Sequence, residues 1–241
     1  HLFDQEMAKK MQNAALQQQK ELPIHKDYGE SGYKWHELKH PTNPEITEQA
    51  LKYEGDTMGH CVGGYCDRVQ SGDTKIFSLR DKKGEPHVTI EVRPRKVEKW
   101  SDVSKLYGTE AAKEMSGEIL NRFIKHPDRF TNINLGEDLF NDMFKGKTID
   151  SIVQIKGKQN TKPNEKYIPM IQDFIKSGKW DAIEDIDNAE MLNIGHDRDA
   201  VKYFRDKGEE PPNYITWQEL RDIDEALNRG HAKGGLVQKF G

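Results

Sequence analysis

The segment from Asp56 to Val69 reads DTMGHCVGGYCDRV, and it decides how the centre of the chain folds. Its apolar side chains recur at the i, i+3, i+4 and i+7 spacing of one helix face, which predicts a helix over residues 58–70. The apolar positions are Val62, Tyr65, Cys66 and Val69. Gly63 and Gly64 interrupt this helix and together cost about 2 kcal/mol of helix stability relative to alanine. The segment therefore needs a physical reason for its glycines.

One hypothesis makes Cys61 a nucleophile. The predicted helix puts this thiol near a helix amino terminus, where the helix dipole and free N–H groups stabilise a thiolate. His87 opens a predicted strand, and a helix-borne cysteine followed by a strand-borne histidine is the order of papain-like and transglutaminase-like enzymes. Gln154, Asn160 or Asp102 would then orient the imidazole. The candidate catalytic residues are Cys61, His87, Gln154 and Asn160.

The competing hypothesis makes Cys61 a small buried residue in a tight helix–sheet contact, which also accounts for the glycines. His60 is then a hydrogen-bonding residue near the start of the helix. Strand alternation favours this hypothesis, because Val88, Ile90 and Val92 share one face of their strand and His87 lies on the other. If the helix covers the apolar face, His87 and Cys61 lie on opposite sides of the sheet.

The fold class follows from three predicted strands and several predicted helices. Residues 75–81 and 86–94 alternate as strands around a turn at Lys83 and Gly84, which predicts an antiparallel hairpin. Residues 150–160 read as a third strand that ends in a glycine turn, and a helix follows over about 164–177. We therefore expect an α+β protein with a small antiparallel sheet of three or more strands and a helix packed on it.

The flanks of this core read as helical extensions. Residues 1–50 form a predicted N-terminal helical arm, whose first helix spans 3–21 and whose second begins at Asn43-Pro44-Glu45. Residues 51–177 form the core, with a helical insertion over about 101–148. Residues 178–241 form a predicted C-terminal extension of short amphipathic helices, ending in a tail without periodicity. The thin apolar stripe of the first helix and the aperiodic tail predict self-association or binding of a protein partner.

Composition narrows the functional classes. Hydrophobic residues make up 34% of the 241-residue chain and charged residues 32%, which indicates a modest core among polar helices. The net charge of −4 gives no general electrostatic attraction for nucleic acid. No apolar run approaches the ~18 residues of a membrane span, and no signal peptide is visible, so we expect no membrane association and a cytoplasmic location in the host.

The two cysteines and one histidine pair predict neither a disulfide nor a metal site. Cys61 and Cys66 lie on different faces of the predicted helix, so we expect both thiols to be reduced. His36 and His40 have the i, i+4 spacing of zinc ligands, but no glutamate adjoins the second histidine and Pro41 stops a helix there. We expect no metal site and no cofactor.

Four segments in one order resemble PcfJ-like proteins of conjugative plasmids and bacteriophages, over about residues 51–177. They read EGDTMGHCVGGY, IFSLRD, PHVTIEV and IVQIKGKQN. The matching positions are Met58, His60, Cys61, Val62, Gly63 and Tyr65, then Leu79 and Arg80, then Thr89 and Glu91, and finally Gln154, Gly157, Lys158 and Asn160. The resemblance implies an accessory factor of DNA transfer or a segment of a large phage protein, without an established enzymatic activity.

A basic cluster offers a third interpretation. Arg93, Arg95, Lys156, Lys158 and Lys162 lie on or beside two predicted strands, where they could contact phosphates. The function we expect first is a non-enzymatic accessory or structural module of a phage or mobile element, such as a virion component or a segment of a larger polyvalent protein. The alternatives are a thiol-dependent hydrolase or transferase and a nucleic-acid-binding module.

Overall fold

The computed structural model describes residues 2–98, 102, 147–178 and 180–237. The chain forms two compact units, and each is assembled from two separate stretches. Unit 1 comprises residues 1–95 and 150–189, and unit 2 comprises residues 96–149 and 190–241. The expected helical insertion over 101–148 lies outside the described residues, apart from Asp102, Lys147 and Thr148, of which Thr148 begins a strand.

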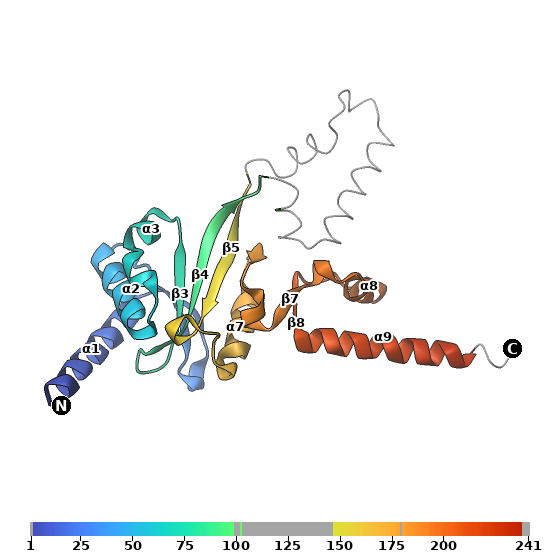
Figure 1. Cartoon of the computed structure of the whole chain (residues 1–241), viewed down its shortest axis with the longest axis horizontal. Helices are drawn as coiled ribbons and strands as arrows, with labels where there is room; N and C mark the ends of the chain where they lie inside the picture. The colour runs from blue at the N-terminus through green and yellow to red at the C-terminus, as the bar shows by residue number, and fades with distance from the viewer. Residues whose placement is uncertain (1, 99–101, 103–146, 179, 238–241) are drawn as a thin grey trace, which may run out of the picture. The chain divides into compact units, whose positions relative to one another are not determined.

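Unit 1 is built on a six-stranded sheet with the order β1-β2-β3-β4-β5-β6 (Figure 1). The strands are β1 (Ile24–Asp27), β2 (Lys34–Glu37), β3 (Lys75–Arg80), β4 (Pro86–Lys96), β5 (Thr148–Lys156) and β6 (Ala182–Ile183). β1 to β4 are antiparallel neighbours, whereas β5 and β6 run parallel, so the sheet is mixed. The expected α+β class is confirmed.

The β3–β4 hairpin forms as the sequence predicts. Ser78 pairs with Thr89 and Phe77 with Ile90 in an antiparallel register. Gly84 closes the turn at φ 77°, in the left-handed region that glycine adopts without strain. Its N–H donates to the Asp81 carbonyl at 2.9 Å. The alternation of β4 therefore fixes which residues face each side of the sheet.

The helices confirm some expectations and correct others. They are α1 (Leu2–Glu21), α2 (Pro44–Met58), α3 (Cys66–Ser71), α7 (Ile168–Ser177), α8 (Arg198–Asp206) and α9 (Trp217–Val237). The predicted helices over 3–21 and 164–177 match α1 and α7. The continuous helix predicted over 58–70 is wrong, because a 3-10 turn, η2 (Cys61–Gly64), separates α2 from the short α3. α2 also runs across the expected domain boundary at residues 50 and 51.

Helices cover both faces of the sheet. Ile76 packs into one apolar cluster with Ala50, Leu51 and Val62, so α2 and η2 lie on its face of β3. Phe77 points the other way and contacts Phe174 of α7, with ring centroids 5.1 Å apart. The expectation that the motif segment covers the apolar face of β4 is therefore wrong. It covers the face that carries Ser78, Arg80 and Thr89, where all three side chains donate hydrogen bonds to Glu54 of α2.

The strand β2 corrects a second expectation from local sequence. Residues around His36 and His40 have helical spacing, yet Lys34–Glu37 pairs with β3 as an extended strand. His40 lies beyond it, and its Nδ1 accepts a hydrogen bond from the Asn43 N–H at 2.8 Å. The two imidazoles therefore do not share a helix face.

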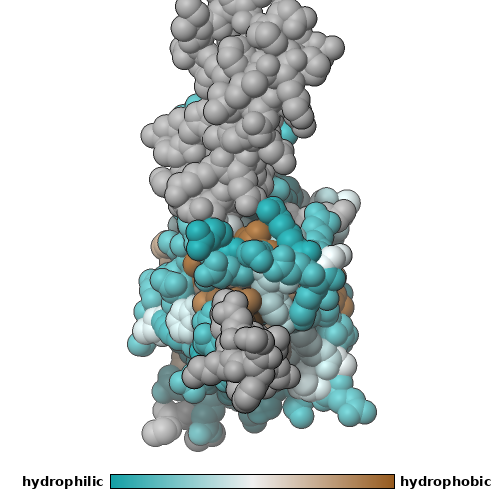
Figure 2. All heavy atoms as spheres, turned by 90° about the vertical axis from the view of Figure 1, so that its right-hand side faces the viewer, coloured by the Kyte–Doolittle hydropathy of each residue, from teal (hydrophilic) through white to brown (hydrophobic). Residues whose placement is uncertain are grey.

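Unit 2 contains a small sheet of its own. β7 (Met191–Asn193) pairs antiparallel with β8 (Tyr214–Thr216). Its apolar cluster includes Ile194, Ala200, Ile215 and Ile223, which joins this sheet to α8 and α9. The expectation of only short helices over residues 178–241 is corrected by β7, and the tail without periodicity continues α9 as far as Val237. Figure 2 shows a face of the molecule whose described surface is mainly hydrophilic, with hydrophobic residues in small areas.

Candidate functional site

The MGHC sequence follows the carboxyl end of α2. Asn43 caps the start of this helix, where its Oδ1 accepts the Glu45 N–H at 3.0 Å, and Pro44 occupies the first turn. Gly59 ends the helix at φ 70°. Cys61 therefore begins a four-residue 3-10 turn after a helix carboxyl end. It lacks the α-helix amino terminus that the nucleophile hypothesis required.

A close approach of two glycines joins α2 to η2. A Cβ built on Gly55 would lie 2.8 Å from the Gly63 backbone nitrogen, which is closer than real Cβ contacts come. Gly63 itself has room at ordinary contact distance, with 3.7 Å to the Leu51 carbonyl oxygen. A Cβ on Gly64 would meet nothing within 4 Å. The tight contact expected from the glycines is thus present, but its sterically restricted member is Gly55.

Cys61 is exposed, so its expected burial in a helix–sheet contact is wrong. The segment turns outward at Cys61 because Val62, the next residue, fills the core instead. The Cys61 Sγ lies 3.3 Å from the Tyr65 hydroxyl, and this contact raises the pKa of Tyr65. Cys66 is half-buried, and burial raises the pKa of its thiol.

His60 connects the first motif segment to the fourth. Burial lowers the pKa of its imidazole, while Glu54 and a backbone hydrogen bond at Gly157 act in the opposite direction. Gly59 faces the turn that follows Gly157, where a Cβ on it would lie 3.5 Å from the Gln159 Cα. The first and last segments, about a hundred residues apart in sequence, therefore meet in the fold.

A buried polar cluster lies under α2, and we call it the Glu54 network: Glu54, Ser78, Arg80 and Thr89. The Glu54 carboxylate accepts hydrogen bonds from Ser78 Oγ at 2.7 Å, Arg80 Nη2 at 3.1 Å and Thr89 Oγ1 at 2.6 Å. Arg80 Nε also donates to Ser78 Oγ at 3.1 Å. The side chains of Glu54 and Arg80 are both 0% exposed. The three hydrogen bonds to the Glu54 carboxylate compensate part of the hydration that burial removes, whereas Arg80 Nη1 is buried without a hydrogen-bond partner among the described residues.

The Glu54 network unites three of the motif segments. Arg80 ends the IFSLR strand and Thr89 lies in the HVTIEV strand, both already marked by the resemblance. Glu54 was not among the residues predicted from the sequence to have a role. Its signal was a carboxylate on the buried side of a helix, in line with Ala50, Leu51 and Met58. A charge on the apolar stripe of a helix predicts a buried partner, and Arg80 is that partner.

Glu91 of β4 has a role similar to that of Glu54, nearer the end of the strand. Its Oε1 accepts hydrogen bonds from Thr74 Oγ1 at 3.0 Å and Arg93 Nε at 2.6 Å. Arg68 of α3 adds an ion pair at 3.7 Å. Glu91 thus anchors Arg68 of α3 and Thr74, which precedes β3, to β4.

The candidate catalytic residues do not form one constellation. A register shift in the β3–β4 pairing lies beside His87, whose Nε2 lies 3.1 Å from Asp81 Oδ2. The ring of His87 stacks on Tyr167 with centroids 5.0 Å apart. Gln154 and Asn160 are exposed, and Asn160 has φ 58° in the η4 turn (Lys158–Asn160). Cys61 contacts Tyr65, so its described partners and those of His87 have no residue in common.

Carboxylates accompany most of the candidate cations for nucleic acid. Ion pairs join Arg93 to Glu91 at 2.6 Å, Arg95 to Glu184 at 2.9 Å, Lys156 to Asp185 at 3.0 Å and Lys158 to Glu85 at 2.6 Å. Lys162 is exposed in the segment that follows η4. The positive charge of this cluster is therefore largely balanced by neighbouring acids.

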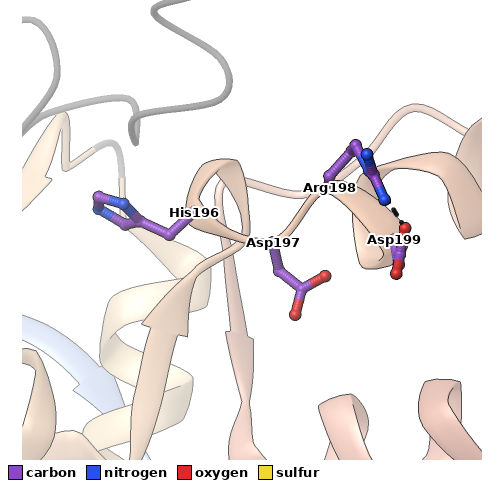
Figure 3. A pocket seen from close by; sticks show the side chains of 4 residues that line it. All are labelled: His196, Asp197, Arg198 and Asp199. Carbon is purple, nitrogen blue, oxygen red and sulfur yellow. Dashed lines mark hydrogen bonds and ion pairs between the residues drawn. The ribbon is translucent and has the colours of Figure 1, made fainter.

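Unit 2 contains an open hollow of about 320 Å³ lined by His196, Asp197, Arg198 and Asp199 (Figure 3). Asp197 caps α8, since its Oδ1 accepts the Ala200 N–H at 2.9 Å. Arg198 pairs with Asp199 at 3.3 Å. In Figure 3 the His196 ring and the Asp197 carboxylate point in different directions. The hollow is lined by four consecutive residues at the start of α8, and their side chains do not point toward a common centre.

Two general features of the described residues bear on function. Nowhere in this part of the chain do three or more His, Cys, Asp or Glu side chains gather in a way that could hold a metal ion. None of its helices combines the length and the apolar character needed to cross a membrane.

Comparison with known proteins supports the family resemblance. Residues 6–103 match the family model described as PcfJ-like protein. The match includes most of α1 and the first three motif segments, and it ends before the fourth. No curated protein and no solved structure matches the chain. Over residues 6–103, this chain is therefore similar to PcfJ-like proteins.

Proposed function

We propose that this chain is a non-enzymatic accessory or structural module of a bacteriophage or another mobile element. It would act in the host cytoplasm or in the virion, alone or as a segment of a larger polyvalent protein. The observation that carries the proposal is the Glu54 network. Its polar side chains bind one another inside the fold, with Glu54 and Arg80 both 0% exposed, so they stabilise a scaffold and do not face a substrate.

The arm of unit 1 supports a binding role for this scaffold. Phe3, Met7 and Met11 of α1 are 72%, 46% and 46% exposed. Large apolar side chains gathered on one exposed helix face are typical of protein–protein contact sites. We call these three residues the α1 stripe.

The test is complementation of the mobile element that encodes the chain, with transfer or particle production as the readout. A Phe3→Ser, Met7→Ser, Met11→Ser variant should fold and lose function, because it removes the binding face. A Cys61→Ser, His87→Gln variant should retain function, because catalysis is not required. The reverse result would refute the proposal. Circular dichroism and thermal melting of each purified variant provide the folding control.

The exposure of Cys61 is the one observation that favours the alternative of a thiol-dependent hydrolase or transferase. Iodoacetamide should alkylate Cys61 before Cys66, because Cys66 is half-buried and its thiol pKa is raised. An enzyme additionally needs His87 to affect that reactivity. Alkylation of Cys61 that slows after His87→Gln would favour the enzyme, whereas an unchanged rate supports an ordinary surface thiol.

The nucleic-acid alternative has a separate test. Binding of DNA or RNA at low salt, with a salt dependence that flattens after Lys156→Gln, Lys158→Gln and Lys162→Gln, would support it. We expect weak binding, because Lys156 and Lys158 are already paired with Asp185 and Glu85.

A further inference from the structure

Three polar side chains in the interior of unit 1 have buried atoms without a hydrogen-bond partner among the described residues. These atoms are Gln19 Oε1, Arg80 Nη1 and both ring nitrogens of His36. Arg80 and His36 are 0% and 1% exposed, whereas Gln19 is half-buried. Buried polar atoms in proteins almost always have a partner, and ordered water is that partner where no protein group reaches them. The positions of the three side chains therefore decide whether one ligand can serve them all.

Strand pairing brings Arg80 and His36 together. Ser78 is the partner of His36 in the β2–β3 register, and residues directly opposite each other in antiparallel strands share one face of the sheet. Arg80 bends back over this pair, because its Nε donates to Ser78 Oγ at 3.1 Å. Its Nη2 donates to Glu54, so Nη1 is the group of this guanidinium that needs a further partner.

The last turn of α1 lies over the same place. Gln19 Nε2 donates to the carbonyl of Asp81, the residue after Arg80, at 3.3 Å. The Leu22 backbone acts on His36 by raising its pKa, although no hydrogen bond of ordinary geometry joins the two. The end of α1 thus covers the Arg80–His36 pair, and the Gln19 amide approaches the pair from that side.

The hydrogen-bonding capacity of these groups selects the ligand. Burial, and then the charge of Arg80, lower the pKa of His36 to about 4, so its ring is neutral at neutral pH. Arg80 Nη1 only donates and Gln19 Oε1 only accepts, whereas a neutral imidazole offers one donor and one acceptor. An anion would meet acceptor atoms beside the Glu54 carboxylate, and a metal cation would meet the guanidinium. Water both donates and accepts, so it matches the set.

We propose that an internal water molecule binds between Arg80 Nη1, the His36 ring and Gln19 Oε1. It accepts a hydrogen bond from the guanidinium and donates one to the Gln19 amide oxygen, with the imidazole as its third partner. About three such bonds are usual for a buried water. The water joins the last turn of α1 to β2 and β3, so it helps to fix where the arm leaves unit 1. This inference does not depend on the proposed function.

Nuclear Overhauser effects between water and the full chain test the site directly. At neutral pH the His36 ring protons should show an effect to water with the sign of a molecule that tumbles with the protein. The His36→Gln variant, which lacks these ring signals, identifies them among the histidines. Ring protons that contact only protein groups, or a ring N–H bonded directly to the Leu22 carbonyl, would overturn the proposal.

Magnetic relaxation dispersion of the water oxygen signal measures how much long-lived internal water the chain holds. Gln19→Leu should lower the dispersion amplitude by the equivalent of one molecule, because the water loses its acceptor on α1. Gln17→Leu is the matched control, since Gln17 is exposed on the same helix, and it should leave the amplitude unchanged. Equal amplitudes in both variants and the unchanged chain would contradict the proposal. Thermal melting confirms that each variant is folded, and the Overhauser measurement decides if Gln19→Leu is not.

Discussion

Two regions of unit 1 distribute polar and apolar side chains in opposite ways. Beneath α2, the interior holds a carboxylate and a guanidinium that water does not reach. Along α1, the surface holds Phe3 and two methionines that water does reach. The first region includes Arg80 and Thr89, which the family resemblance marked, and the second includes none of the marked positions. The motif residues Arg80 and Thr89 therefore belong to the interior of the scaffold. The α1 stripe, from which the sequence already predicted partner binding, lies on the surface and is the proposed binding face.

The largest expected effect comes from breaking the interior pair. Glu54→Ala leaves Arg80 buried without its carboxylate, and removal of one partner of such a pair typically costs ~3–5 kcal/mol. Urea denaturation should measure this loss in the free energy of unfolding. As a control, Glu54→Leu combined with Arg80→Met should be more stable than Glu54→Ala, because no unpaired charge remains. A loss below about 1 kcal/mol would show that the network does not stabilise the scaffold.

The same interior should make stability depend on pH. Burial, with the charge of Arg80 as the second cause, lowers the pKa of His36 to about 4 from its ordinary value of 6.5. Between these values the unfolded chain binds a proton that the folded chain does not, so stability falls as pH falls from 6.5 to 4. Each pH unit costs up to ~1.4 kcal/mol from this one group.

Denaturation at several pH values, repeated for His36→Gln, measures the contribution of His36. The variant should show a shallower fall between pH 6.5 and 4. An identical fall in both proteins would assign the pH dependence to other groups. α1 contains no histidine between Leu2 and Glu21, so this titration belongs to the interior region alone.

The glycine contact gives an effect of intermediate size. Gly55→Ala would place a methyl group against the Gly63 backbone, and such overpacking typically costs ~1–3 kcal/mol. Gly64→Ala is the matched control, because its Cβ would point into open space. Thermal melting should therefore separate two substitutions that remove glycines nine residues apart. Equal melting temperatures would show that α2 and η2 can move apart without cost.

The smallest effect is expected on the α1 stripe. Substitution of Phe3, Met7 and Met11 by serine removes exposed side chains, and surface changes usually alter stability by within about 0.5 kcal/mol. Urea denaturation should give nearly the same free energy of unfolding as the unchanged chain. A loss as large as that of Glu54→Ala would mean that the stripe packs within the fold, which would erase the contrast between the two regions.

The sequence predicted the parts of the fold that depend on neighbours along the chain. The β3–β4 hairpin follows from alternation and a glycine turn, and α2 begins at the Asn43-Pro44 signal that was recognised. β2 could not be found this way, because its four residues become a strand only by pairing with the distant β3. The predicted 58–70 helix failed because Gly59 adopts a positive φ, which periodicity does not reveal.

The candidate site was harder to predict, since burial depends on contacts between segments. Cys61 was expected to be buried in a helix–sheet contact rather than reactive, and its exposure depends on how η2 packs against Gly55. Strand alternation predicted the face on which His87 lies. It could not predict the register shift beside His87 or the stacking of its ring on Tyr167. Burial of Glu54 was not predicted, because one acidic residue in a polar sequence is not distinctive until the buried face of its helix is known.

Unit 1 is made of two separate stretches of the chain, so during translation its first stretch leaves the ribosome before the second has been made. β5 is the neighbour of β4 in the sheet, yet the unit leaves off at residue 95 and resumes at residue 150. At ~5–20 residues per second, translation of the 54 intervening residues (96–149) leaves the edge of β4 open for about 3–11 s. Open strand edges pair with other chains. A fragment cut at residue 103, where the family match stops, would keep that edge permanently and should aggregate through it.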